Sequence, residues 1–188
     1  MAKNFGKNEE RTAEYLKKFN REKVLKLLVD SNSPTILDVG ANNGSSLVEF
    51  KKWWPSSKVH CFEPQSECWD ELDDLSNEFT NVRINKFALG NKNDESKEFY
   101  SHDLNTGISG FNKINIESKD SIDLSKLSND DSSLENHKKT INHKRNVQVK
   151  RLDEYIKNDK NINQIDLLKI DTQGFELEIL EGLGTELN

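Results

Sequence analysis

Apolar residues recur along the chain in two patterns, short continuous runs and helical spacings. Runs of the length typical of buried strands occupy residues 36–39, 59–62, 82–89 and 165–170. Between the runs, apolar side chains at helical spacing form three sets: Leu47, Phe50 and Trp54; Cys68, Leu72, Leu75 and Phe79; and Phe175, Ile179 and Leu183. This alternation predicts an α/β fold with a doubly wound, mostly parallel sheet and helices on its faces.

Two further segments complete the predicted organisation. Residues 1–33 are expected to form an N-terminal helical segment, with a helix over residues 9–29, and residues 34–188 a single domain. The positions of the first helix that we expect to be buried are Leu16, Phe19, Val24, Leu27 and Leu28. Residues 114–146 are rich in Ser, Asp, Asn and Lys and predict a polar surface loop inserted in the domain.

The first strand leads into the most informative motif, a turn of small residues followed by a helix. The run Ile36-Leu37-Asp38-Val39 continues into Gly40-Ala41-Asn42-Asn43-Gly44, and a helix begins at Ser45-Ser46. Such a turn places free N–H groups and a helix N-terminus at the carboxyl end of a strand, where open α/β sheets bind nucleotide-like ligands. The carboxylate of Asp38 disfavours a pyrophosphate and suits a ligand with a positive group. The motif therefore predicts an adenosine cofactor with a cationic end, and S-adenosyl-L-methionine is the candidate.

A second acid supports this cofactor. Glu63 follows the run of residues 59–62 and lies 19 residues after Gly44. In adenosine sites on open sheets, an acid about 20 residues beyond the glycine turn accepts hydrogen bonds from the ribose hydroxyls. A dinucleotide is the competing ligand, but its G-x-G-x-x-G fingerprint requires a glycine where this chain has Asn42, and the later spacing also differs. A tight strand-to-helix turn without a ligand is the other alternative for the glycines.

Composition excludes several classes of function. Of 188 residues, 33% are hydrophobic and 32% charged, and the net charge of −6 leaves no basic face for nucleic acid. The N-terminus lacks the apolar stretch of a signal peptide, and no apolar run is long enough for a membrane span. Cys61 falls in a predicted strand and Cys68 in a predicted helix, so we expect buried thiols in a reducing compartment. The sequence thus predicts a cytoplasmic protein.

The last predicted strand and helix carry two of the three candidate catalytic residues. Asp171 follows the run of residues 165–170; a carboxylate there would orient a hydroxyl and accept its proton, or would cap the next helix. Glu176 falls in the first turn of that helix, where the helix dipole alone would also account for it. His102 is a candidate base beside Asn105-Thr106-Gly107, a segment expected to fold over the cofactor. No histidine shows metal-ligand spacing, so no metal site is predicted.

Four motifs in chain order resemble the FkbM family of S-adenosyl-L-methionine-dependent methyltransferases. They are Asp38–Gly44, Phe62-Glu63-Pro64, Ala88-Leu89-Gly90 and Leu168–Glu176. The last contains a K-I-D-x-x-G-x-E signature and is the most specific. The resemblance implies a Rossmann-like, seven-stranded sheet and methyl transfer to a hydroxyl of a sugar, glycan or natural product.

The resemblance also implies roles for individual residues. They are Gly40, Asn42 and Gly44 at the methionine end of the cofactor, Glu63 at its ribose, Phe87-Ala88 at its adenine, and Asp171 beside the transferred methyl group. Gln173 stands where many relatives carry Glu. The usual last strands of the family are missing, so we expect the strand of residues 165–170 to be an open sheet edge that a second copy or another partner would cover.

The leading hypothesis is an S-adenosyl-L-methionine-dependent O-methyltransferase acting on a small-molecule or glycan acceptor. The alternative is a non-catalytic, cofactor-binding half-domain or interaction module, which the missing strands favour. A nicotinamide-dependent oxidoreductase is the third hypothesis, and the glycine spacing argues against it.

Overall fold

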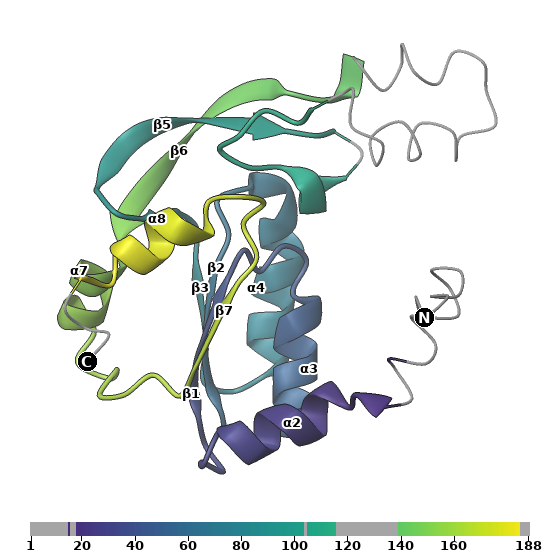
Figure 1. The fold of residues 1–188 in the computed structure, drawn as a ribbon, viewed down its shortest axis with the longest axis vertical. Helices are drawn as coiled ribbons and strands as arrows, with labels where there is room; N and C mark the ends of the chain where they lie inside the picture. The colour runs from purple at the N-terminus through teal and green to yellow at the C-terminus, as the bar shows by residue number, and fades with distance from the viewer. Residues whose placement is uncertain (1–14, 16–17, 104, 116–138, 185–188) are drawn as a thin grey trace, which may run out of the picture.

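The computed structural model describes residue 15 and residues 18–103, 105–115 and 139–184 (Figure 1). In chain order, the elements are α2 (Arg21–Leu28), β1 (Thr35–Val39), α3 (Ser45–Trp53), β2 (Lys58–Phe62), the 3₁₀ turn η1 (Ser66–Cys68), α4 (Trp69–Glu78), β3 (Val82–Asn85), β4 (Ala88–Gly90), β5 (Asp94–Ser101), the 3₁₀ turn η2 (Thr106–Ile108), β6 (His143–Arg151), α7 (Leu152–Asn158), β7 (Leu167–Ile170) and α8 (Glu176–Glu181).

Four parallel strands form the central sheet in the order β3-β2-β1-β7. Helices α3 and α4 pack on one face through Leu47, Phe50 and Leu72, and α7 and α8 pack on the other through Leu152 and Ile179 (Figure 1). Because both faces are covered, β1 is buried along its whole length. The predicted α/β fold with a mostly parallel, doubly wound sheet is therefore confirmed, and in the described part of the chain β3 and β7 are the two outer strands of this sheet.

A second sheet lies above the carboxyl ends of the central strands (Figure 1). In it β6 pairs with β4 in parallel and with β5 in antiparallel orientation. The resemblance implied one seven-stranded sheet, whereas the described strands form two sheets of four and three strands. The prediction of a single strand over residues 82–89 is also wrong, because this range contains β3 and most of β4. Pairing in the central sheet stops where Phe62 meets Asn85, because β2 ends there, and Ala88 pairs instead with Val149 of β6.

Helix α2 is more exposed than the apolar pattern predicts. The prediction that Leu27 and Leu28 are buried is wrong, since they are 84% and 75% exposed. Leu25 and Val29 contact the core instead. Val29 caps the end of the helix with an extended backbone and packs into the core there, whereas Leu27 and Leu28 in the last turn face solvent. Leu16 lies outside the described residues.

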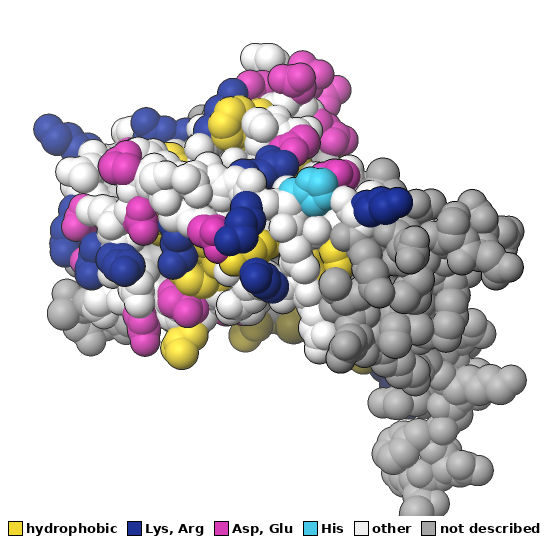
Figure 2. Space-filling model, turned by 90° about the horizontal axis from the view of Figure 1, so that it is seen from above, with side chains coloured by type: hydrophobic (Ala, Val, Ile, Leu, Met, Phe, Trp, Pro, Cys, Tyr) yellow, Lys and Arg dark blue, Asp and Glu magenta, His cyan; other side chains and the backbone are white. Residues whose placement is uncertain are grey.

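The polar segment predicted over residues 114–146 is described only at its ends, because residues 116–138 lie outside the described part. Within it, β6 begins at His143, earlier than the polar composition suggests, because backbone pairing with β5 extends to Ser101. Seen from above this pair of strands, Lys and Arg lie among Asp and Glu over most of the described surface, and acidic side chains gather at the upper edge of the view (Figure 2). Among the described helices, none has the length and apolarity to cross a membrane.

Candidate functional site

A cavity opens at the carboxyl ends of the central strands, below the segment that follows β5. It encloses about 580 Å³, counting the space open to solvent. The loops after β1, β2 and β7 contribute to its lining, together with β4 and residues 105–112, which we call the roof segment. Of the residues predicted to bind a cofactor, the structure brings Gly40, Asn42, Glu63 and Ala88 to this cavity, whereas Asp38, Asn43 and Gly44 do not line it.

The turn after β1 has a backbone that few residues other than glycine adopt. Gly40 has a φ of 73°, and a Cβ there would lie 2.0 Å from the carbonyl oxygen of Asp171. Gly44 has a φ of 81°, and a Cβ there would lie 2.4 Å from Leu75 of α4. Both positions therefore require glycine. The close approach of Gly40 to Asp171 places the turn after β1 directly beside the loop after β7.

Glu63 is the acid that lines the cavity from the end of β2. Its side chain is almost fully buried, and Oε1 accepts hydrogen bonds from the backbone N–H and the Nε2 of Gln65 at 2.9 and 3.2 Å. Oε2 accepts the backbone N–H of Asn42 at 2.9 Å. Burial raises the pKa of Glu63, and the hydrogen bonds from Gln65 and Asn42 oppose that rise. Since a carboxylate oxygen accepts two hydrogen bonds, Oε2 retains capacity for a ligand hydroxyl.

Asp38 lies beneath the turn rather than in the cavity. Leu37 and Val39 join the apolar cluster on the α7 and α8 face, so the alternation of the strand directs Asp38 to the α3 face. There it is fully buried, 2.9 Å from the Nζ of Lys169, its register partner on β7. The contact is an ion pair; neither carboxylate oxygen has a well-aligned hydrogen bond among the described residues. Burial raises the pKa of Asp38, and the charge of Lys169 lowers it.

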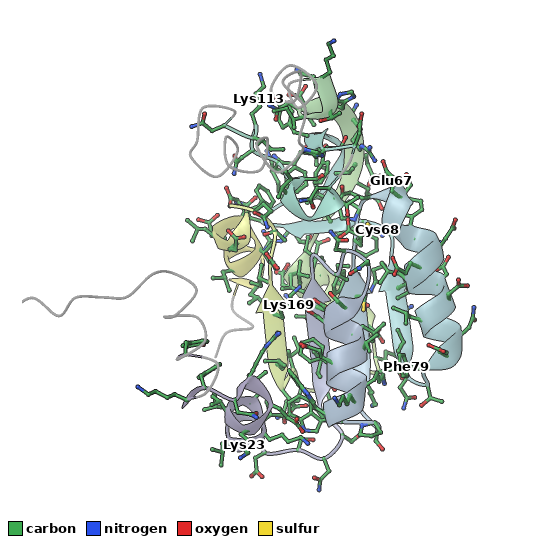
Figure 3. The ribbon with its side chains drawn as sticks, turned by 90° about the vertical axis from the view of Figure 1, so that its right-hand side faces the viewer. Lys23, Glu67, Cys68, Phe79, Lys113 and Lys169 are labelled. Atoms are coloured by element: carbon green, nitrogen blue, oxygen red, sulfur yellow. The ribbon has the colours of Figure 1, made fainter. Side chains whose placement is uncertain are left out.

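The prediction that Asp38 offers a free negative charge to a ligand therefore needs revision. In the described structure its charge is already compensated by Lys169, which comes from the β7 strand (Figure 3). The Nζ of Lys169 also donates to the carbonyl of Gly40 at 2.9 Å and lies 4.0 Å from Oδ2 of Asp171. Lys169 thus contacts β1, the turn that follows β1 and the loop that follows β7. The apolar pattern of β7 did not predict this role.

The three candidate catalytic residues occupy different environments. Asp171 lines the cavity, and its side chain is 61% exposed. Glu176 does not line it; its Oε1 accepts the backbone N–H groups of Thr172 and Gly174 at 3.0 and 3.1 Å and so fixes the loop after β7. Burial opposes ionisation of Glu176, but these backbone hydrogen bonds hold its pKa below the ordinary value. We therefore assign Glu176 a structural contact with the loop.

His102 is buried and likewise does not line the cavity. Its Nδ1 accepts the backbone N–H of Asn105 at 3.0 Å, and its own backbone N–H donates to the Oγ of Ser109 at 3.0 Å. These contacts hold the beginning of the roof segment in place. The expectation that residues 105–107 fold over the site agrees with the lining, which includes Thr106 and Gly107.

Sequence reasoning missed the aromatic wall of the cavity. Phe111 of the roof segment packs against Phe99 of β5 and Phe175 at the start of α8, with ring centroids 5.3 and 4.3 Å apart. All three line the cavity. Phe175 was predicted as a core residue from its helical spacing, and Phe99 and Phe111 lie in irregular or short extended segments, so no periodic signal marked them as site residues.

The charged side chains in the described lining are all acidic. This lining includes two carboxylates, Glu63 and Asp171, and no Lys, Arg or His side chain. A ligand phosphate would meet two carboxylates and no basic side chain in this lining, the ammonium of Lys169 lying 4.0 Å behind Asp171, whereas a ligand cation would be attracted. The cavity therefore favours a cationic or neutral ligand and argues against a dinucleotide.

Comparison with known proteins indicates the family of this chain. The sequence model of the methyltransferase FkbM domain family matches residues 38–188. Methyltransferase sdnD of Sordaria araneosa is 27% identical over 171 residues, which cover 82% of this chain and 62% of that protein. The crystal structure of methyltransferase FkbM from Methylobacillus flagellatus KT covers 90% of this chain and 35% of that chain, with 17% identity and a TM-score of 0.49. The chain thus spans less than two thirds of the length of either relative.

Proposed function

The chain belongs to the methyltransferase FkbM domain family, and on this premise we propose that it transfers a methyl group from S-adenosyl-L-methionine to a hydroxyl oxygen of a small-molecule or glycan acceptor. The observation that carries this proposal is the pair of carboxylates in the cavity. Glu63 follows β2 and Asp171 follows β7, so they flank the glycine turn of β1 from its two sides, with no basic side chain in the described lining.

The residues present fit this cofactor. The turn at Gly40 leaves no room for a side chain, because a Cβ would meet the carbonyl of Asp171, and this close packing brings Asp171 beside the turn. Glu63 has acceptor capacity for the ribose hydroxyls, and Ala88 offers an apolar surface suited to the adenine. Because Lys169 compensates Asp38, we propose that attraction of the cationic end depends mainly on Glu63 and Asp171, with Asp38, Asn43 and Gly44 shaping the turn from below.

The chemistry that follows asks little of the protein beyond positioning. When bound, S-adenosyl-L-methionine supplies a methyl group on a sulfonium, which is already activated for displacement. The aromatic wall and the roof segment hold the acceptor and limit water in the cavity. Asp171 accepts a hydrogen bond from the acceptor hydroxyl and takes its proton as the carbon–oxygen bond forms. Glu176 keeps the loop between Asp171 and Gly174 in the conformation that this contact needs.

Calorimetric titration with S-adenosyl-L-methionine and S-adenosyl-L-homocysteine tests the proposed cofactor. We expect saturable binding to the native chain and, in Glu63→Ala, binding weaker by at least about tenfold, since hydrogen bonds to a charged group contribute about 1.5–3 kcal/mol. Asp70→Asn is the matched control, because it removes an exposed carboxylate of α4 that does not line the cavity. Circular dichroism must show that Glu63→Ala remains folded. No binding by the native chain, or equal weakening in the control, would contradict the proposal.

A second variant separates cofactor binding from catalysis. Asp171→Asn should keep most of the affinity for S-adenosyl-L-homocysteine while lowering its formation from S-adenosyl-L-methionine in a mixture of hydroxylated acceptors. Binding without turnover by the native chain, across sugars, glycans and hydroxylated small molecules, would favour the alternative of a non-catalytic cofactor-binding module.

A further inference from the structure

Thr106 of the roof segment joins two loops that come from different strands. Its Oγ1 donates to the Oδ1 of Asn42, in the turn after β1, at 3.0 Å. Its carbonyl oxygen accepts the Nε2 of Gln65, in the loop after β2, at 3.1 Å. Gln65 is buried and is also bonded to Glu63 through both its backbone and side chain. One residue of the roof therefore contacts both loops that we propose to hold the cofactor.

Two other contacts fasten the roof and the strands that carry it. Nδ2 of Asn112 donates to the carbonyl of Gly174, in the loop after β7, at 3.0 Å. Arg145 of β6 forms a two-pronged ion pair with Glu67 of η1 at 2.5 and 2.6 Å, and Figure 3 shows Glu67 beside Cys68 near the end of α4 closest to the second sheet. The Arg145 pair is partly exposed, so screening weakens it. The Thr106 contacts are more enclosed and reach the cavity itself.

Asn42 combines an uncommon backbone conformation with a side-chain contact to the roof segment. Asn42 has a φ of 48°, in the left-handed region where a residue with a Cβ is at a disadvantage relative to glycine. Its Oδ1 accepts from Thr106 and lies 3.7 Å from the Sγ of Cys68. Burial raises the pKa of Cys68 to about 11, so the thiol remains a donor at neutral pH. Glycine would suit the backbone better but would leave Thr106 without this acceptor.

We propose that Thr106 is a positioning residue: through Asn42 and Gln65 it fixes the roof segment over the turn after β1 and the loop after β2, so that the order of the roof depends on those two loops. Because Ser109 and Phe111 belong to the same segment and line the cavity, occupation of the loops also fixes the part of the lining available to the acceptor. The identity of the bound cofactor rests on the proposed function, whereas the contacts belong to the protein alone.

Hydrogen exchange of the full chain without ligand tests the contacts directly. The readout is the exchange of Ser109 and Gly110, whose amides donate to Thr106 and Tyr100. Thr106→Val keeps the branched shape but removes the hydroxyl, and Asn42→Gly removes the acceptor in a backbone that glycine tolerates. Each should speed exchange about 2- to 12-fold, the factor that corresponds to the net strength of one hydrogen bond.

Two comparisons decide whether the effect comes from this hydrogen bond. Thr106→Ser keeps the hydroxyl and should exchange almost as slowly as the native chain. Because both substitutions remove the same bond, the double variant Thr106→Val/Asn42→Gly should exchange no faster than the faster single variant. Native-like exchange in Thr106→Val, or effects that multiply in the double variant, would overturn the proposal.

A ligand arm separates failure of this inference from failure of the proposed function. With S-adenosyl-L-methionine at a saturating concentration established by calorimetry, roof exchange should slow in the native chain and slow less in Thr106→Val. If the native chain binds this ligand and its roof exchange does not change, the dependence of the roof on the two loops is wrong. If the native chain does not bind it, the cofactor assignment is wrong, and the ligand-free exchange still decides the role of Thr106.

Discussion

Replacing Lys169 with Met should destabilise the protein strongly, because it leaves the buried carboxylate of Asp38 without its ion-pair partner. Asp38 is fully buried, and the ammonium of Lys169, 2.9 Å away, is its ion-pair partner in the described structure. Two unit charges at that distance attract by about 6 kcal/mol at an effective dielectric constant of about 20. Structural relaxation and partial protonation reduce the loss, and breaking one side of a buried pair typically costs about 3–5 kcal/mol. We expect Lys169→Met to lie in that range.

The reverse substitution should cost less. In Asp38→Asn, Lys169 keeps its hydrogen bond to the carbonyl of Gly40, and its side chain is 18% exposed, so its charge remains partly hydrated. We expect a loss of about 1–2 kcal/mol, typical of one altered buried polar contact. The double variant Asp38→Asn/Lys169→Met has no buried carboxylate without a partner at this position and should therefore be more stable than Lys169→Met alone.

Urea denaturation followed by tryptophan fluorescence measures these differences, since Trp54 is buried in the core. Burial already raises the pKa of Asp38, and removing Lys169 removes a charge that lowers it. A carboxyl with a raised folded-state pKa loses stability as pH rises through that pKa, so the deficit of Lys169→Met should be larger at pH 7.5 than at pH 5. A deficit below about 1 kcal/mol, a deficit independent of pH, or a double variant less stable than Lys169→Met would refute the reasoning.

Three further substitutions test other parts of the fold. Gly40→Ala should cost more than the roughly 1–2 kcal/mol of a left-handed backbone, because its Cβ would also lie 2.0 Å from the carbonyl of Asp171; thermal denaturation measures the loss. Burial lowers the pKa of His60, whose Nδ1 lies 2.7 Å from the hydroxyl of Tyr155. Because the unfolded chain binds a proton at this residue more readily than the folded protein, the free energy of unfolding should fall as pH drops below 6.5. His60→Asn should flatten that dependence in urea titrations at pH 5 to 7.5. Glu176→Gln should cost about 1 kcal/mol, the difference between charged and neutral hydrogen bonds, and should speed hydrogen exchange in residues 172–174; unchanged exchange there would contradict its assigned contact.

The residues brought together at the cavity follow a simple rule of parallel sheets. Glu63 and Asp171 each follow an apolar run, and the glycine turn follows another. Because the carboxyl ends of parallel strands meet at one edge of the sheet, their convergence could be predicted without knowing any long-range contact. By the same rule Gly40 could be placed at this edge, whereas only the family resemblance pointed to Ala88, which belongs to the second sheet.

The environment of Asp38 could be predicted only in part. Strand alternation indicates that it faces away from Leu37 and Val39, but its compensation depends on Lys169, 131 positions later. That pairing requires β7 to lie beside β1 in one register, which no local pattern specifies. Whether the charge of Asp38 is compensated therefore depends on which strand lies beside β1.

The amino-acid sequence alone indicated the helices and strands of the central sheet, the glycine-dependent turn and the acids at the strand ends, because periodicity and backbone conformation are local properties. Folding in three dimensions decided how residues 82–89 divide between two sheets, that Lys169 pairs with Asp38, and how Thr106 contacts Asn42 and Gln65. The roof segment has no repeating apolar pattern, and its conformation is held by hydrogen bonds to distant loops. Such contacts exist only once the strands that carry those loops have paired.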